Sequence, residues 1–346
     1  MALTARELLT QWPYRSQNFN DEEFFRNMHE CDHYLLTAPK YGANFESKYI
    51  NIKDSERLSL KSSNPPSEHW LFLGGSTTFC LEVEDESTVS SCIQRSLNLD
   101  EDNLIQCHNL AWPGLKVSKI KDFLDRGLIS YPDTKKVIVL FGVNDAGWIS
   151  GAAPKNKFQS IISRLLLPLS SSIRLADYLN RRIQIGRVRR YSRIYALSTI
   201  RILREIQLSL NQRSIESYFL LQPNLICKAN VSADELRILR SINPVRAAGL
   251  YVAYRTYLKE GEGVVSCITE SFDKFVEPLY LDWCHVGIKG NQLLSESILT
   301  VIKMNSSNGL LNEFSLQLMK SRSADLMKLH NIGKNRDEVP YNYPLY

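Results

Sequence analysis

Short apolar runs recur along the chain from residue 70 onward, separated by longer segments that mix apolar and polar residues. Each run has the length of a strand that is buried in a sheet. The runs lie at 70–73, 104–110, 137–141, 218–221 and 264–268. This pattern predicts about five strands.

The segments between the runs carry apolar residues at the spacing of helices. The clearest is 287–302, where Leu294 and Ile298 fall on one helical face, and similar spacing marks 87–97 and 117–128. Strand and helix alternating in this way predict an α/β fold. We expect a three-layer α/β/α sandwich, in which a doubly wound parallel sheet of about five strands lies between two layers of helices.

The pattern is interrupted between the third and fourth strands. Residues 151–216 hold apolar residues at helical spacing, and we predict two or three inserted helices there, as a candidate lid over or beside the site. Residues 1–68 are interpreted as an N-terminal arm and linker, and 305–346 as a C-terminal tail. The remaining 69–304 then form one α/β domain.

Composition places the chain among globular proteins. Apolar residues make up 44% and charged residues 23%, and the net charge is +5. The first residues lack the basic and then apolar pattern of a secretory signal, and no apolar run approaches the roughly 20 residues that span a bilayer. We therefore expect a cytoplasmic protein without a transmembrane segment.

Seven cysteines are spread singly, at positions 31, 80, 92, 107, 227, 267 and 284. An odd number without a Cys-x-x-Cys pair argues against a disulfide framework or a zinc site. We expect reduced, buried thiols and no metal centre.

The first candidate for chemistry is Ser76, which follows the run 70–73 and two glycines, Gly74 and Gly75. Glycines let the backbone turn sharply and approach a ligand closely. A serine after them would lie at the carboxyl edge of the sheet, where open α/β sheets bind ligands. Taken alone, the segment fits a Gly-Gly turn with a capping Ser-Thr pair better.

Polar groups follow two further predicted strands. Asn144 comes directly after the third strand, and Gly114 lies in a turn after the second. A side-chain amide or a backbone N–H at these points can donate hydrogen bonds into the crevice at the sheet edge. Each segment alone is more typical of an Asx-turn or a Pro-Gly turn.

Asp282 and His285 stand three residues apart, just before the last predicted helix. The carboxylate can hold one ring nitrogen of the histidine, which leaves the other nitrogen free to take a proton from a hydroxyl. Because the chain has six histidines, a chance pairing or a helix cap beside a packed histidine also fits.

These blocks occur in order along the chain, each after a predicted strand: Gly-Gly-Ser76-Thr, Gly114, Asn144 and Asp282-x-x-His285. The combination resembles the SGNH hydrolase (GDSL-like esterase/lipase) superfamily, in the branch whose first block reads Gly-Gly-Ser-Thr. The resemblance covers 70–302 apart from the insertion, and it implies strand order 2-1-3-4-5. Gly75 replaces the acidic residue of the Gly-Asp-Ser form.

The resemblance implies a role for each residue. Ser76 would be the nucleophile, His285 the general base and Asp282 the residue that orients the histidine. The oxyanion hole would comprise the backbone N–H groups of Ser76 and Gly114 and the side-chain amide of Asn144. A serine hydroxyl needs such a base, and fixed donors stabilise the charge of a tetrahedral intermediate. No metal or cofactor is required.

We therefore predict a serine esterase that forms an acyl-enzyme on Ser76. The breadth of the family implies short acyl groups such as acetyl, carried on a carbohydrate or other small molecule, with lipid esters next. One alternative is an acyltransferase that passes the acyl group to a glycan. Another is a non-catalytic binding protein that uses a basic surface.

That surface would come from the insertion, where arginines cluster at 181, 182, 187, 189, 190, 193, 201 and 204. It would meet an anionic partner such as an acidic glycan or a phospholipid surface. The few interleaved aromatic residues disfavour single-stranded nucleic acid. A solvated helix face, paired in part with the acidic stretch 82–86, fits the arginines slightly better.

Two other features have plainer explanations. His29 and His33 have the spacing of a helical metal pair, but the sequence offers no third ligand near them. Cys284 adjoins His285 and would be a nucleophile if its thiolate were stabilised. Side chains of chain neighbours usually point apart, which favours a structural thiol.

Overall fold

The computed structural model describes residues 22–39, 42–60, 65–98, 104–125, 131, 133–147, 170–304 and 313–332. In the helices at 170–211 and 313–332, side chains are described for 185–211 and 316–326. The first part of the predicted insertion, 151–169, lies outside the described residues, and so does most of the predicted C-terminal tail.

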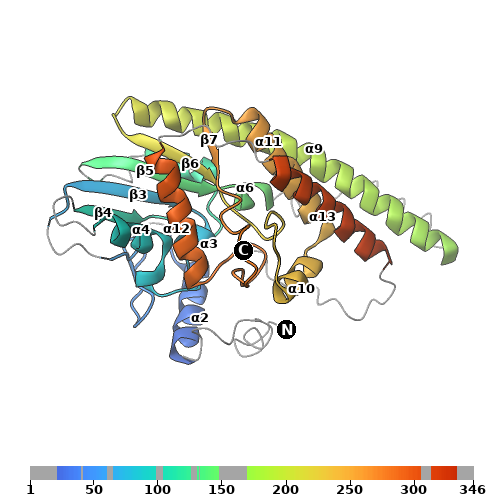
Figure 1. Cartoon of the computed structure of the whole chain (residues 1–346), viewed down its shortest axis with the longest axis horizontal. Helices are drawn as coiled ribbons and strands as arrows, with labels where there is room; N and C mark the ends of the chain where they lie inside the picture. Colours follow the sequence, from blue (N-terminus) through green and yellow to red (C-terminus); the bar gives the residue numbers. More distant parts are fainter. Residues whose placement is uncertain are drawn as a thin grey trace.

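A seven-stranded sheet forms the centre of the molecule (Figure 1), in the order β1-β2-β4-β3-β5-β6-β7. Five adjacent strands are parallel: β4 (Ile105–Asn109), β3 (Glu68–Gly74), β5 (Thr134–Phe141), β6 (Glu216–Leu221) and β7 (Val265–Cys267). Counted along the chain, these five strands follow the expected order 2-1-3-4-5. The predicted α/β fold class is therefore confirmed.

The two central strands, β3 and β5, are covered on both faces. Phe72 and Leu73 of β3, with Ile138 and Val139 of β5, have no exposed surface. Burial on both sides explains why these strands appear in the sequence as continuous apolar runs rather than as an alternation. The strand order reverses at β3, so the connections after β3 and β4 leave on different sides and a crevice can form at the carboxyl ends.

Two short strands extend the sheet at its β4 edge. β1 (Ile52–Lys53) pairs with β2 (Glu56–Arg57), and β2 pairs with β4, both antiparallel. The sequence analysis placed this segment in an arm or linker and missed the strands, because two residues are too few to show a period. Before them, α2 (Glu22–Thr37) is helical, and its Phe24 and Phe25 are buried.

The helices form a layer on each side of the sheet. α4 (Val89–Leu97) and α12 (Ile288–Lys303) pack together on the face turned to the viewer in Figure 1. In the other layer, α9 (Ser170–Asn211) contacts both α5 (Val117–Asp125) and α11 (Pro244–Glu260). α13 (Glu313–Ile332) packs on α11. α10 (Ala233–Ser241) comes directly before α11 in the chain.

In the described part of the inserted region, 170–216, the structure has one helix of 42 residues, α9, where the sequence pattern predicted two or three shorter helices over 151–216. Its sequence contains no proline and a single glycine, Gly186, so nothing interrupts the helix until Ser214 takes a left-handed conformation with φ 56°. A buried stripe that includes Ala196, Leu203 and Leu210 covers the domain. Tyr195, which neighbours Ala196 in the chain, is exposed.

All seven cysteines are free, and all but Cys267 are buried. None of the described helices is both long enough and apolar enough to cross a bilayer.

Candidate active site

Ser76 begins the four-residue helix α3 (Ser76–Phe79) at the carboxyl end of β3. The two glycines before it occupy positions that have no room for a side chain. A Cβ at Gly74 would lie 2.2 Å from Thr78 Oγ1, and a Cβ at Gly75 would lie 1.9 Å from Asn144 Nδ2. This contact explains why Gly75 stands where the Gly-Asp-Ser form has an acidic residue. Any side chain at position 75 would displace the Asn144 amide.

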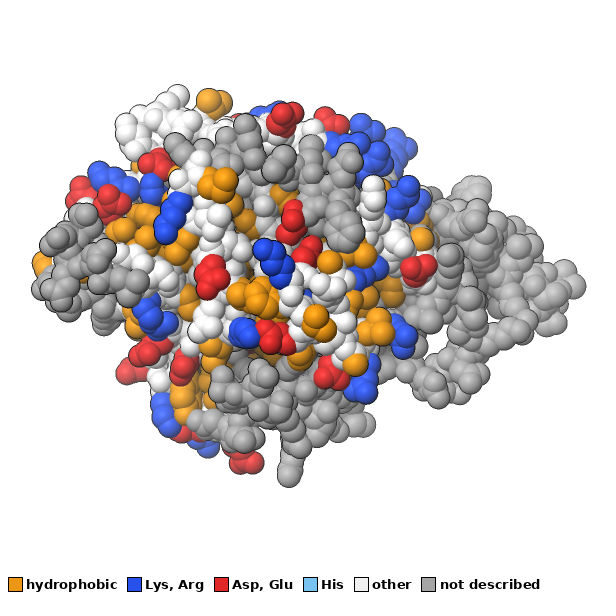
Figure 2. Space-filling model, viewed as in Figure 1, with side chains coloured by type: hydrophobic (Ala, Val, Ile, Leu, Met, Phe, Trp, Pro, Cys, Tyr) orange, Lys and Arg blue, Asp and Glu red, His pale blue; other side chains and the backbone are white. Residues whose placement is uncertain are grey.

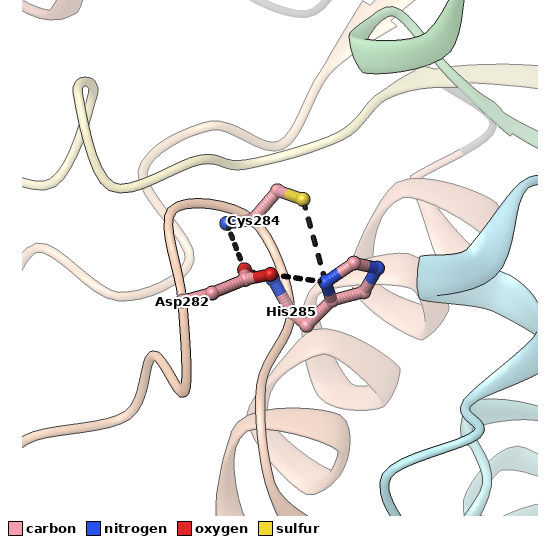
Figure 3. A group of neighbouring side chains, drawn as sticks. All are labelled: Asp282, Cys284 and His285. Carbon is pink, nitrogen blue, oxygen red and sulfur yellow. Dashed lines mark hydrogen bonds and ion pairs between the residues drawn. The ribbon is translucent and has the colours of Figure 1, made fainter. Parts of the chain in front are cut away.

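Asp282 and His285 lie in the loop between β7 and α12 (Figure 3). Asp282 Oδ1 accepts hydrogen bonds from the backbone N–H groups of Cys284 and His285, each at 2.7 Å. Its other oxygen, Oδ2, lies 2.7 Å from His285 Nδ1. Both carboxylate oxygens are therefore used to fold the loop and to hold the ring.

The rest of the loop is tied to neighbouring segments. Leu281 N–H donates to the His285 carbonyl, and Leu225 N–H donates to the Trp283 carbonyl. An isolated antiparallel bridge pairs Tyr280 with Val286. These backbone bonds fix the loop at its two ends and from the β6 side, so the position of the His285 ring does not depend on side-chain contacts alone.

The loop brings His285 to Ser76, which is 209 residues away in the chain. His285 Nε2 lies 2.7 Å from Ser76 Oγ. A continuous line of contacts thus runs from the Ser76 hydroxyl through the imidazole to the Asp282 carboxylate. All three residues are partly exposed, with 20% of the His285 side chain and 31% of the Asp282 side chain open to solvent.

Two opposing effects act on the pKa of His285. Burial disfavours the charged ring, but the Asp282 carboxylate, with contributions from Cys284 and Glu82, outweighs burial and raises the pKa well above its ordinary value. The pKa of Asp282 is lowered, because the His285 ring and the backbone donors outweigh the burial that would raise it. The pair therefore favours a carboxylate at Nδ1 and a strongly basic ring.

Asn144 and Gly114 lie at the ends of the two strands beside β3. Asn144 is in α6 (Val143–Gly147), directly after β5, and its Nδ2 donates to the Leu115 carbonyl at 3.2 Å. Gly114 has φ 74°, in the left-handed region that suits glycine, with open space around its Cβ position. Trp112 N–H donates to the Gly74 carbonyl at 3.1 Å, which ties this turn to the Ser76 loop.

Sequence analysis missed one residue of this neighbourhood, Glu82. Its Oε1 lies 3.8 Å from His285 Nε2, and the residue is 8% exposed. The acidic stretch 82–86 was expected to pair in part with the inserted arginines. That expectation is wrong for Glu82, which is buried beside His285, and for Asp85, which pairs with Arg57 at 2.8 Å. A glutamate in an apolar context, six residues after Ser76, is too weak a signal to find from the sequence.

Asp282, Cys284 and His285 also form the one group of potential metal ligands found in the described part of the chain. Cys284 Sγ lies 3.6 Å from His285 Nδ1, the nitrogen that also contacts Asp282. Burial raises the pKa of the Cys284 thiol to about 12, so the thiolate that would bind a metal or attack a substrate is disfavoured. The groups suit a hydrogen-bonded triad better than a metal site.

The remaining predicted residues lie elsewhere. His29 and His33 are exposed on α2 and belong to no metal-ligand group among the described residues. Arg189, Arg190 and Arg193 are exposed on α9, and Figure 2 shows Lys and Arg side chains gathered at the upper right, where α9 runs in Figure 1. An anionic partner for this surface stays a prediction of the sequence. The side chains of Arg181 and Arg182 lie outside the described residues.

Neither a protein-family model nor a curated protein sequence matches the chain. Among solved structures it is similar to an acetyl xylan esterase, AlAXEase, with 11% identity and a TM-score of 0.43 over 68% of this chain and 99% of that one. Axe2, an acetylxylan esterase from Geobacillus stearothermophilus, shows 15% identity and a TM-score of 0.41 over 68% and 94%.

A member of the lipolytic protein G-D-S-L family from Veillonella parvula shows 11% identity and a TM-score of 0.39 over 68% of this chain and 98% of that one. At these identities and scores, the similarities assign neither a substrate nor a mechanism to this chain.

Proposed function

We propose that this protein is a serine esterase that cleaves carboxylic esters through an acyl-enzyme on Ser76. The observation that carries the proposal is the line of 2.7 Å contacts from Ser76 Oγ to His285 Nε2 and from His285 Nδ1 to Asp282 Oδ2. A serine hydroxyl is a weak nucleophile without an adjacent base, and this arrangement supplies the base, its orientation and its counter-charge.

In the first half of the reaction, Ser76 Oγ attacks the ester carbonyl and His285 Nε2 takes its proton. Asp282 holds Nδ1 in its protonated form, so Nε2 is the nitrogen that accepts. The carbonyl π bond opens to an oxyanion. The Nε2 proton then passes to the alcohol oxygen as the C–O bond breaks, which leaves the acyl group on Ser76 and releases the alcohol.

In the second half, a water molecule gives a proton to His285 Nε2 and attacks the acyl carbon. The collapse of this intermediate returns the proton to Ser76 Oγ and releases the acid. A hydroxyl of a glycan in place of water would give acyl transfer, and the product identifies which acceptor is used.

The negative charge of both intermediates needs hydrogen-bond donors that are already in place. We assign this role to the backbone N–H groups of Ser76 and Gly114 and to the Asn144 amide. The contact between the Gly75 position and Asn144 Nδ2 supports the assignment, because it sets the amide against the turn that carries Ser76. A donor of this kind contributes about 3 kcal/mol to transition-state stabilisation.

For the substrate we propose short acyl esters, such as acetyl esters, on a carbohydrate. The support is the resemblance of the four sequence blocks to SGNH hydrolases.

The test is covalent labelling with a fluorophosphonate, followed by mass spectrometry of the peptides. We expect the label on Ser76 and expect Ser76→Ala to lose both the label and the hydrolysis of p-nitrophenyl acetate. Ser241→Ala, which removes an exposed hydroxyl on α10, is the matched control and should keep both. A label on another residue, or full activity in Ser76→Ala, would contradict the proposal.

A further inference from the structure

Glu82 is a buried carboxyl group that the esterase mechanism leaves unused. It lies on the Nε2 side of His285, at 3.8 Å, opposite the Asp282 side of the ring. Within the described part of the chain, the His285 ring is its one ion-pair partner, and no donor from another residue is hydrogen-bonded to it. A carboxyl group whose side chain is 11% exposed and that receives no hydrogen bond from another residue has an unfilled capacity for hydrogen bonds.

The backbone before Glu82 is fixed by the turn that ends α3. Cys80 ends α3 in the left-handed conformation, with φ 58°, and its N–H donates to the Ser76 carbonyl at 2.8 Å. A non-glycine residue pays a conformational cost there, so the surrounding contacts must impose it. This turn directs the chain back toward His285 immediately after the helix that carries Ser76.

Arg57 fixes the segment just after Glu82 through contacts with Val83 and Asp85. Its side chain has no exposed surface, and its Nη2 donates to the Val83 carbonyl at 2.8 Å. Its Nε lies 2.8 Å from Asp85 Oδ1. Glu82 therefore lies between two residues whose backbone groups are hydrogen-bonded to other segments, and these bonds fix the backbone from which its side chain reaches the ring.

The proposed reaction determines which part of the substrate lies beside Glu82. His285 Nε2 delivers its proton to the alcohol oxygen of the ester, so that oxygen must come within hydrogen-bond distance of Nε2. The alcohol part of the substrate, rather than its acyl part, then occupies the space that Glu82 borders. A carboxyl group there can accept hydrogen bonds from hydroxyls next to the ester.

Resting on the proposed esterase function, we propose that Glu82 is a specificity-determining residue that binds hydroxyl groups on the alcohol part of the substrate, so that the site prefers esters of polyols or sugars. A cationic alcohol part fits less well, because it would repel the imidazolium that forms at His285 during the reaction. An anionic alcohol part would be repelled by Glu82 and Asp282.

The test compares two acetate esters with the same three-carbon skeleton, glycerol 1-acetate and propyl acetate, competing in one solution. Because both react with the same free enzyme, any change in the protonation of His285 cancels in the ratio of their kcat/KM values. We expect the wild type to prefer the glycerol ester by about 10–100-fold, the range for a hydrogen bond to a charged group. Glu82→Ala should remove this preference, and Glu82→Gln should reduce it while keeping the shape of the side chain.

Glu86→Gln is the matched control, since Glu86 is exposed four residues away, and it should keep the preference. Fluorophosphonate labelling of Ser76 in the Glu82 variants shows that they are folded and competent. An unchanged ratio in both Glu82 variants would overturn the inference and leave the esterase proposal standing. Absence of Ser76-dependent hydrolysis in the wild type would overturn both.

A third ester, 2-(trimethylammonio)ethyl acetate, tests whether Glu82 senses charge instead. We expect Glu82→Gln to change its kcat/KM relative to propyl acetate by less than it changes that of the glycerol ester. A larger loss on the cationic ester would overturn the assignment to hydroxyl groups.

Discussion

His285 and His108 each contact a carboxylate at nearly the same distance, yet the surroundings of the two rings differ. His285 Nδ1 lies 2.7 Å from Asp282, and His108 Nδ1 lies 2.8 Å from Glu56. The second nitrogen of His285 meets the Ser76 hydroxyl, whereas the second nitrogen of His108 meets His69 Nδ1 at 2.8 Å.

The His108 cluster is closed by aromatic packing. The Tyr131 ring stacks on His108 with 3.8 Å between ring centroids, and the Tyr131 hydroxyl donates to Glu56 at 2.5 Å. Both nitrogens of His108 and both carboxylate oxygens of Glu56 are therefore used within the cluster. A histidine–carboxylate pair by itself is therefore a structural element. The pair becomes a candidate for catalysis when the second ring nitrogen contacts a nucleophile at the edge of the sheet, with an amide nearby, as His285 contacts Ser76.

The largest effect is expected when each histidine is replaced by alanine, and the two replacements test the comparison directly. We expect His285→Ala to lower kcat/KM for p-nitrophenyl acetate by about 10⁴-fold, because the general base is removed. His108→Ala should keep kcat/KM and instead lower the free energy of unfolding by about 1–3 kcal/mol, because it leaves the partly buried Glu56 and His69 side chains each without a hydrogen-bond partner. Steady-state kinetics and urea unfolding separate the two effects. Equal losses of activity would break the comparison.

A smaller effect is expected from the amide beside Ser76. Asn144→Ala should lower kcat by about 10²–10³-fold, the range for removal of one oxyanion donor. Asn243→Ala is a control for stability, since the Asn243 side chain caps α11 by accepting from the Val245 and Arg246 N–H groups. It should cost about 1 kcal/mol of stability with kcat retained. A kcat for Asn144→Ala within a few-fold of the wild type would remove Asn144 from the proposed oxyanion hole.

The smallest effect concerns how stability depends on pH. Burial and the neighbouring His108 lower the pKa of His69, so the unfolded chain binds more protons and this group costs stability as the pH falls below about 6.5. The pKa of His285 is raised, so its contribution is present at low pH and is lost as the pH rises through the folded-state value.

Urea unfolding at pH 5 and pH 8 measures the direction in which each histidine changes the free energy of unfolding with pH. Relative to the wild type, His69→Gln should gain stability on going from pH 8 to pH 5, and His285→Gln should lose it. The same direction of change in both variants would contradict the opposite environments assigned to the two rings.

The strands show what a sequence pattern can locate and what it misses. The apolar run 70–73 lies inside β3, and 137–141 lies inside β5, but both strands begin earlier, at Glu68 and Thr134. Their first residues are polar and join the sheet through backbone hydrogen bonds, which carry no side-chain signature. For the same reason the sequence pattern did not predict β1 and β2 at the β4 edge of the sheet.

Sequence by itself located the five parallel strands along the chain and the candidate residues Ser76, Asn144, Asp282 and His285, because apolar periodicity and local motifs are properties of neighbours in the chain. The order of these strands in the sheet was expected only from the resemblance to SGNH hydrolases. Tertiary structure alone decided that α9 is one long helix, that Gly75 leaves room for the Asn144 amide, and that Glu82 lies against His285 rather than near the arginines. These outcomes depend on distances between segments far apart in the chain, which are set by how the layers pack.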